Sequence, residues 1–242
     1  MVWLSQAAAG GLTVLLLLLS ACAGPEWTYR LLPDSELEIT VWQREGEASG
    51  PTVYVVGGTH GDETAGWQAG IALREAELQA GTLYVAAPIN AYGAEHDQRR
   101  TRQDRDVNRN FPGDPEGCDA EQIAWAVFED IRDKRPDLVL DLHEARAPEG
   151  SRDDLRGAVI CQDVQAVGDL VLDLLAAFRE EDRPLTLYGS PPLGSLNRTV
   201  TEELGIPVLT IETGRDEALE QRVERQLAIV EFILSWYDMV EG

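Results

Sequence analysis

Short apolar runs alternate along this chain with longer segments of helical periodicity. The apolar runs are rich in Val, Ile and Leu and predict strands at residues 37–43, 52–56, 82–87, 137–142, 158–161, 185–188 and 208–211. Amphipathic segments predict helices at residues 63–78, 120–134, 164–180 and 217–239. This alternation predicts a single α/β domain, in which a mostly parallel mixed sheet carries helices on both faces.

One long segment, residues 88–117, follows neither pattern. A loop of this length inside a compact domain is more often functional than accidental. A solvated surface loop is the alternative. The segment contains five arginines, of which we expect only two or three to act: Arg99, Arg100, Arg102, Arg105 and Arg109.

Two strand ends carry metal-ligand chemistry. His60 and Glu63 follow the run 52–56, and His143 closes the run 137–142. An imidazole and a carboxylate three positions apart suit chelation, and catalytic zinc usually takes three such protein ligands. The sequence therefore predicts one Zn²⁺ per chain on His60, Glu63 and His143, with Asp62 capping the helix that follows. Two unrelated histidines are the weaker alternative, because the chain has only three.

A further carboxylate, Glu212, ends the run 208–211. Zinc lowers the pKa of its bound water to about 7 and polarises a carbonyl oxygen. A carboxylate beside that water can accept its proton and return it to the leaving nitrogen. This pattern predicts amide hydrolysis with Glu212 as the general base. The alternative is that Glu212 caps the next element or pairs with Arg215.

Four motifs in one order carry a family resemblance: His60-x-x-Glu63, Asp106-Val107-Asn108-Arg109, His143 and Glu212. Over residues 50–215 the chain resembles the zinc carboxypeptidase superfamily, and most closely its succinylglutamate desuccinylase/aspartoacylase branch. The resemblance implies a zinc carboxypeptidase-like fold, with the ligands and the general base given above.

The resemblance also implies roles for the arginine-rich loop. Asn108 and Arg109 would bind a carboxylate of the substrate, for which the planar fork of arginine is suited. Arg102 would polarise the scissile carbonyl, with Arg100 as the alternative.

Two acids are candidates to orient the histidine ligands. By resemblance, Asp106 would accept a hydrogen bond from His60, although a salt bridge to a neighbouring arginine is the alternative. Asp141 lies two residues before His143, on the same face of the strand, and could act likewise.

These features predict a deacylase that cleaves an amide or ester bond of a carboxylate-bearing substrate, such as a small acylamino acid. A metallocarboxypeptidase acting on peptides or peptidoglycan stems is the alternative. Aspartoacylases carry a further β-rich domain, whereas residues 213–242 here are mostly helical, so we expect a more open pocket. A non-catalytic zinc-binding lipoprotein is a third reading, which the presence of Glu212 disfavours.

The amino terminus predicts export. Residues 12–19 form an apolar run too short to span a bilayer, and Leu19-Ser20-Ala21-Cys22 resembles a lipobox. We predict a signal peptide at residues 1–21, lipidation at Cys22, a tether at residues 22–35 and a catalytic domain at residues 36–242. The lipid would be the sole membrane contact, in a bacterial cell envelope. An uncleaved anchor or a secretory signal stays open, because no Lys or Arg precedes the leucines.

The formal net charge is −23, from 43 acidic and 20 basic residues. Such a charge argues against nucleic acid as a partner. Against this acidic background, the arginine cluster predicts a locally positive pocket for an anionic substrate. The sequence leaves open whether Cys118 and Cys161 pair, and it does not determine the oligomeric state.

Overall fold

The centre of the molecule is one eight-stranded mixed sheet in the order β1-β2-β4-β3-β5-β8-β6-β7. A computed structural model describes residues 26–149 and 153–241. The strands are β1 (Glu26–Leu31), β2 (Ile39–Glu45), β3 (Ala48–Gly57), β4 (Ala80–Ala86), β5 (Leu138–Ala145), β6 (Ala158–Ile160), β7 (Thr186–Tyr188) and β8 (Val208–Gly214).

The middle four strands, β4, β3, β5 and β8, are parallel to one another. Strand β2 pairs antiparallel with β4, and β6 pairs antiparallel with β8. The helices are α1 (Thr64–Ala72), α2 (Ala91–His96), α3 (Asp119–Lys134), α4 (Gly168–Ala177), α5 (Leu196–Leu204) and α6 (Leu219–Trp236). Three 3₁₀ turns are η1 (Leu73–Glu75), η2 (Val107–Arg109) and η3 (Val164–Val167). The predicted α/β fold with helices on both faces is confirmed.

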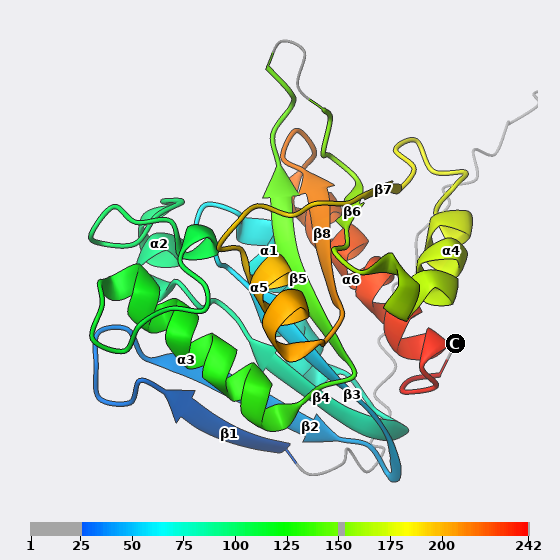
Figure 1. The fold of residues 1–242 in the computed structure, drawn as a ribbon. Coiled ribbons are helices and arrows are strands. Elements are labelled where there is room, and N and C mark those ends of the chain that lie inside the picture. The colour runs from blue at the N-terminus through cyan, green and yellow to red at the C-terminus, as the bar shows by residue number, and fades with distance from the viewer. Residues whose placement is uncertain (1–25, 150–152, 242) are drawn as a thin grey trace, which may run out of the picture.

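Two hydrophobic cores lie on opposite faces of this sheet. Strand β3 shows how the chain builds both, since Val53 and Val55 join one core while Tyr54 and Val56 join the other. Successive side chains of a strand point to opposite faces, so a continuous apolar run fits a central strand. The first core contains residues of α1, α4 and α6, and the second contains residues of α3 and α5. Figure 1 shows α3 and α5 in front of the sheet.

The amino-terminal edge differs from the prediction. Residues assigned to the tether form β1, which pairs antiparallel with β2 from Glu26↔Arg44 to Leu31↔Ile39. Tyr29 and Leu31 pack against the core beside α3, which is why this stretch joins the domain. The sheet thus begins before residue 36. The predicted signal peptide, Cys22 and the first residues of the tether lie outside the described residues.

The strands expected from the apolar runs are all present, with ends shifted by a few residues. The helices differ more. The expected helix at 63–78 is α1 followed by the 3₁₀ turn η1, and the one at 164–180 begins as η3. The short helices α2 and α5 were not predicted, because six to nine residues give too little periodicity to recognise. Asn90 and Ser195 cap them with side-chain oxygens.

Cys118 and Cys161 do not form a disulfide with each other, and Cys161 is buried while Cys118 is partly buried. Within residues 26–149 and 153–241, none of the helices combines the length and the apolar character needed to cross a membrane.

A buried carboxylate of α3, that of Asp130, connects this helix to two strands of the sheet. Asp130 accepts hydrogen bonds from the hydroxyls of Tyr29 on β1, at 2.6 Å, and Tyr54 on β3, at 2.7 Å. Burial first, and then the charge of Asp130, raise the pKa of Tyr54 well above its usual value. The same causes raise the pKa of Tyr29.

We expect the free energy of unfolding to fall above about pH 10, where unfolded tyrosines ionise. The folded protein keeps the proton of Tyr54, so its contribution is complete below that pH and is lost as pH rises towards the folded pKa. Each such tyrosine adds a slope of about −1.4 kcal/mol per pH unit. Tyr54→Phe should remove one such slope in urea titrations between about pH 10 and 12. An unchanged slope would contradict the assignment.

Candidate metal centre and active site

The loop between β3 and α1 folds tightly enough to turn His60 and Glu63 towards the neighbouring strand. Gly58 has a φ of +70°, which favours glycine. A Cβ on Gly61 would lie only 1.9 Å from the backbone of Gly93, so α2 and this loop can pack only without a side chain there. The sequence thus fixes a compact turn at the carboxyl end of β3, where open α/β sheets place their ligands.

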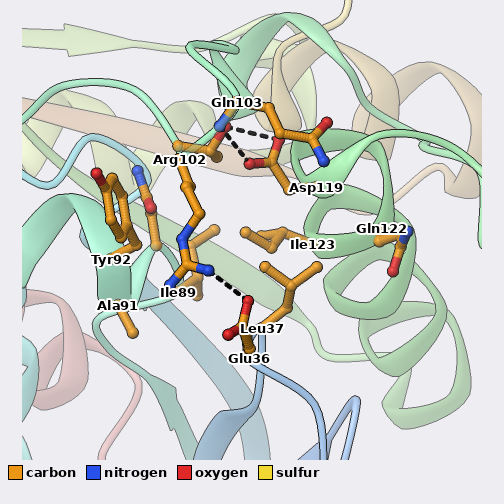
Figure 2. A pocket seen from close by; sticks show the side chains of 12 residues that line it. Glu36, Leu37, Ile89, Ala91, Tyr92, Arg102, Gln103, Asp119, Gln122 and Ile123 are labelled. Carbon is orange, nitrogen blue, oxygen red and sulfur yellow. Dashed lines mark hydrogen bonds and ion pairs between the residues drawn. The ribbon is translucent and has the colours of Figure 1, made fainter.

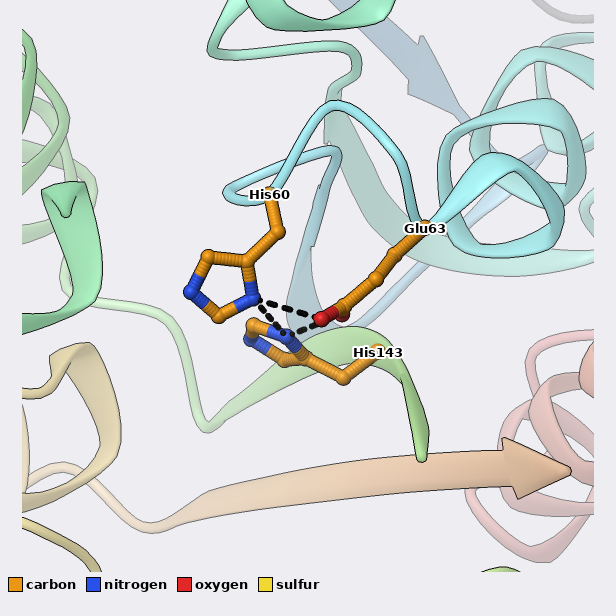
Figure 3. A group of neighbouring side chains, drawn as sticks. All are labelled: His60, Glu63 and His143. Carbon is orange, nitrogen blue, oxygen red and sulfur yellow. Dashed lines mark hydrogen bonds and ion pairs between the residues drawn. The ribbon is translucent and has the colours of Figure 1, made fainter. Parts of the chain in front are cut away.

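His60, Glu63 and His143 meet at one buried point. The Nδ1 atoms of the two imidazoles are 3.2 Å apart. Glu63 places Oε1 2.8 Å from Nδ1 of His60 and Oε2 2.8 Å from Nδ1 of His143. One ligand atom from each residue lies within 4.8 Å of the others. Figure 3 shows the three side chains pointing at a common position.

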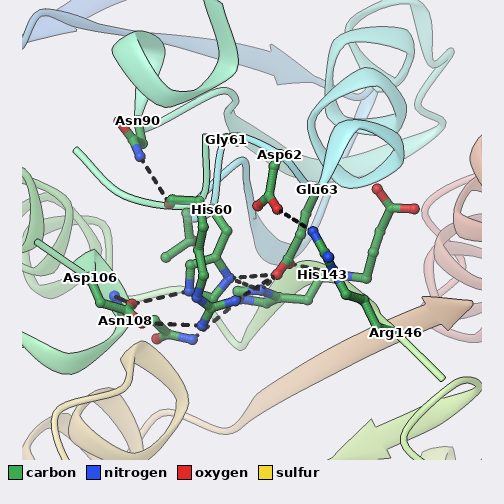
Figure 4. A network of polar contacts seen from close by, with 12 residues as sticks. His60, Gly61, Asp62, Glu63, Asn90, Asp106, Asn108, His143 and Arg146 are labelled. Carbon is green, nitrogen blue, oxygen red and sulfur yellow. Dashed lines mark hydrogen bonds and ion pairs between the residues drawn. The ribbon is translucent and has the colours of Figure 1, made fainter. Parts of the chain in front are cut away.

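The far side of each imidazole contacts a second carboxylate. His60 Nε2 is 3.1 Å from Asp106 Oδ1, and His143 Nε2 is 3.0 Å from Asp141 Oδ1. Both contacts agree with the roles expected from the sequence. Asp106 also pairs with Arg99, so its two expected partners are both present. Figure 4 shows Asp106 directed at His60. Such contacts fix the ring orientation and leave Nδ1 as the ligand atom.

The electrostatics of the cluster favour a cation. Burial opposes ionisation of Glu63, but the two imidazoles outweigh it and hold the pKa of Glu63 well below its usual value. Burial likewise disfavours the charged form of His60, yet Glu63 and Asp106 raise its pKa above 6.5. Burial also disfavours the charged form of His143, but Asp141 and Glu63 outweigh it and raise the pKa of His143 well above its usual value. A bound divalent ion would replace these protons as the positive charge.

The donor set fits zinc. Two imidazole nitrogens and one carboxylate make a three-ligand site of the kind that catalytic zinc occupies, which leaves a position for water or substrate. The three residues are nearly inaccessible, with 2–3% of their surface exposed. Within the described residues, they are the single group of three or more such side chains close enough to hold a metal.

Glu212 lies beside this cluster. In the pairing of β5 with β8, Glu212 is the direct neighbour of His143. Registered residues on adjacent parallel strands share a face, and the strands lie about 4.8 Å apart. Burial, opposed by His143 and reinforced by Glu63, raises the pKa of Glu212 to about 7. This carboxyl therefore exchanges its proton near neutral pH in the metal-free protein.

Asn108 and Arg109 occupy the adjoining turn η2. The buried Asn108 places Nδ2 3.4 Å from Nε2 of His143, while its Oδ1 accepts from the amide of Leu196 at 2.9 Å. Arg109 is exposed and donates to the carbonyl of Asn108. It lines an open hollow beside Asp106, which Arg105 also lines.

Arg102 is not brought to the cluster, which corrects its expected place at the scissile carbonyl. Its Nη1 lies 2.5 Å from Oε2 of Glu36, and its guanidinium lies over the ring of Tyr92. There it lines a separate cavity of about 150 Å³ (Figure 2). Arg100, the alternative, pairs with Asp104 at the surface.

The arginine that does contact the cluster is Arg99. It donates to Oε1 of Glu63 at 3.0 Å and to Oδ2 of Asp106 at 3.1 Å. Sequence reasoning did not single it out, because an irregular loop gives no periodicity to show which of several arginines points inward. Glu144, whose backbone nitrogen donates to Glu63, also had no expected role, because its partner lies 81 residues away in the sequence.

The sequence profile of the succinylglutamate desuccinylase/aspartoacylase catalytic domain matches residues 49–235. The chain belongs to this family. The match begins at β3 and ends in α6, so it includes every element that supplies the site. The expected family is thereby confirmed.

A named relative is the N-alpha-acetyl-L-2,4-diaminobutyric acid deacetylase of Halomonas elongata. It is 37% identical over 112 residues, which are 44% of this chain and 31% of that protein. The chain thus aligns with about a third of that relative's length. The names of the family and of this relative are those of enzymes that hydrolyse acyl amides, so hydrolase is the class that the comparison supports.

Solved structures share the fold. The succinylglutamate desuccinylase/aspartoacylase of Rhodobacter sphaeroides has a TM-score of 0.71 at 24% identity, over 90% of this chain and 67% of that one. The ectoine utilization protein of Ruegeria pomeroyi has a TM-score of 0.70 at 19% identity, over 90% and 69%. The cell shape determinant protein Csd4 of Helicobacter pylori, with product bound, has a TM-score of 0.73 at 14% identity, over 83% and 55%.

We expect metal-free protein to bind about one zinc per chain. Zinc at about 100 times its dissociation constant should raise the free energy of unfolding by about 2.7 kcal/mol, because only the folded state holds the three ligands together. Metal analysis and thermal unfolding with and without zinc would measure both effects. His143→Ala should lose both.

The matched control is His96→Ala, since His96 is exposed and stacks on Tyr92 in α2. This variant should bind zinc as the wild type does. Equal zinc binding by His143→Ala and the wild type would rule out the site.

Proposed function

We propose that this protein is a zinc-dependent hydrolase that removes an acyl group from a small carboxylate-bearing amine, as an N-acyl amino acid deacylase. The observation that carries the proposal is the buried meeting point of His60, Glu63 and His143 with Glu212 beside it. Zinc, when bound there, would supply an acidified water and polarise the carbonyl of the scissile bond.

The chain's own residues would then move the protons. Glu212 is the direct neighbour of His143 in the pairing of β5 with β8, so its carboxylate is placed to accept a proton and return it to the leaving nitrogen. Asp106 and Asp141 would hold the imidazoles in place, because each accepts from an Nε2 atom. The proximity of Glu212 to the ligands supports the role of general base.

Substrate binding is proposed for the loop that carries η2. Arg109 is exposed in the hollow beside Asp106 and so can meet a carboxylate from solvent, while Asn108 lies against His143. Arg99, which bridges Glu63 and Asp106, is a cation in contact with a proposed metal ligand. The deacetylase of Halomonas elongata is named for an acetylated amino acid, which favours a small acylamino acid here.

A substrate panel tests the reaction class. N-acyl amino acids, C-terminal dipeptides and peptidoglycan stem peptides should be compared with and without a chelator. We expect hydrolysis of the first group, its loss with chelator and its return with zinc. Preference for either peptide group would mean that the protein is a carboxypeptidase and not a deacylase.

Anchoring of this activity in a bacterial envelope through Cys22 stays a prediction, which mass spectrometry of the native protein would check.

Glu212→Gln should lower kcat about 10²- to 10⁴-fold, because an amide cannot accept and return the proton. Its zinc content should equal that of the wild type, since Glu212 is not one of the three proposed ligands. Steady-state kinetics and metal analysis on one preparation would measure both. Glu202→Gln, at an exposed carboxylate of α5, serves as the control. Undiminished turnover in Glu212→Gln would remove the general base from the proposal.

Arg109→Ala should lower kcat/KM for a substrate with a free carboxylate about 10- to 100-fold. Hydrogen bonds to charged groups contribute about 1.5–3 kcal/mol, and about 1.4 kcal/mol is a factor of ten. The same substrate with that carboxylate amidated should show no such loss.

Arg179→Ala is the control, because Arg179 is an exposed arginine that pairs with Glu180 and does not line this hollow. Equal losses for the acid and the amide would mean that Arg109 does not read the carboxylate.

A further inference from the structure

Helix α1 lacks a cap of its own. Its N-cap residue is Glu63, whose side chain makes no capping hydrogen bond because its carboxylate is turned towards the two imidazoles. The first turn of α1 also contains no acidic residue. Asp62, which the sequence predicts as the cap, instead pairs with Arg215 at 2.7 Å and with Arg146 at 3.2 Å. Figure 4 shows Asp62 directed at Arg146.

The missing cap comes from another element. Glu144 on β5 places Oε2 2.8 Å from the backbone nitrogen of Ala65, the second residue of α1. This is the amide that a capping side chain ordinarily satisfies, and a negative charge there also suits the helix dipole. The backbone nitrogen of Glu144 donates to Oε2 of Glu63 at 3.0 Å. Glu144 therefore holds both the proposed ligand and the helix that begins beside it.

The alternation of β5 explains how adjacent residues serve two purposes. His143 points into the metal cluster, so Glu144 points to the opposite face, where α1 and α6 pack. Helix α1 lies very close to β5 there: a Cβ on Gly66 would be 2.5 Å from the carbonyl oxygen of Leu142. That approach brings the amide of Ala65 within reach of Glu144.

Helix α6 completes the arrangement. Arg222 pairs with Oε1 of Glu144, whose side chain has no exposed surface. A buried carboxylate needs such a partner to remain ionised. One turn further along α6, Gln226 donates to the carbonyl of His143 at 2.7 Å. Both contacts connect α6 to residues next to or within the proposed metal centre.

We propose that Glu144, held by Arg222, is a positioning residue that caps α1 from outside and thereby frees the carboxylate of Glu63 to bind the metal. The inference rests on the metal site of the proposed function, and it assigns Glu144 no contact with substrate. Removing the carboxylate leaves the amide of Ala65 without its acceptor. The start of α1 then shifts, and Glu63 shifts with it.

Metal affinity of the full-length protein, measured by competition with a chromophoric chelator, tests this inference without reference to activity. Glu144→Ala should weaken zinc binding about 10- to 100-fold, as the loss of groups that orient ligands usually does. Glu144→Gln keeps an oxygen that can accept from Ala65, so its affinity should lie between those of Glu144→Ala and the wild type. Cobalt(II) substituted for zinc should give a visible spectrum that changes in Glu144→Ala.

The control for general destabilisation is Asp130→Asn, which alters a buried, hydrogen-bonded carboxylate in α3. It should lower the melting temperature and leave the zinc affinity and the cobalt spectrum unchanged. Zinc affinity in Glu144→Ala within twofold of the wild type, or an equal loss in Asp130→Asn, would overturn the positioning role. If Glu144→Ala does not fold, Glu144→Gln decides: a zinc affinity below that of the wild type, with a changed cobalt spectrum, would support the positioning role, and wild-type affinity together with a wild-type spectrum would overturn it.

Other results would contradict the proposed function, and they can be told apart from those that overturn the positioning role of Glu144. Wild-type protein that binds neither zinc nor cobalt would remove the metal centre and, with it, the reason for holding Glu63. Wild-type protein that binds zinc but hydrolyses none of the panel would remove the hydrolase and leave the positioning role of Glu144 standing.

Discussion

The structure depends on a carboxylate and two imidazoles held together out of water at one point. Charged groups are stable in such a place only when they are paired, so each of the three needs partners on every side. Glu63 contacts both imidazoles, while Asp106 and Asp141 satisfy the outer nitrogens. The backbone between His60 and Glu63 turns tightly. Gly61 lies so close to the backbone of Gly93 that a side chain would not fit there.

Strand β5 connects this point with the rest of the fold. Asp141 and His143 lie on the face of the sheet that carries the site, whereas Leu142 and Glu144 lie on the face that carries α1 and α6. Because successive side chains of a strand point to opposite faces, these four consecutive residues alternate between the proposed site and the packing against the helices. A change on the supporting face is transmitted to the site through the backbone of β5 and the start of α1.

The arginine-rich loop follows another physical rule. Between α2 and η2 it has no helix or strand to fix which side chains face inward, so ion pairs decide. Arg99 finds Glu63 and Asp106, whereas Arg102 finds Glu36, from the segment between β1 and β2. This ion pair is exposed, so it connects the amino-terminal segment to the loop at the surface of the molecule.

The sequence by itself determined the seven buried or half-buried strands, the two metal-ligand motifs and Glu212, because apolar runs and strand ends are local features. The family resemblance also placed Asp106 at His60, which lies 46 residues away in the sequence. Only the tertiary structure decided the support on the other face of β5, where Glu144 reaches Ala65 over 79 residues. Such contacts depend on which strands become neighbours and on how closely α1 approaches β5, and no local pattern encodes either. For the same reason the choice of Arg99 over Arg102, and the joining of β1 to the sheet, emerged only in three dimensions.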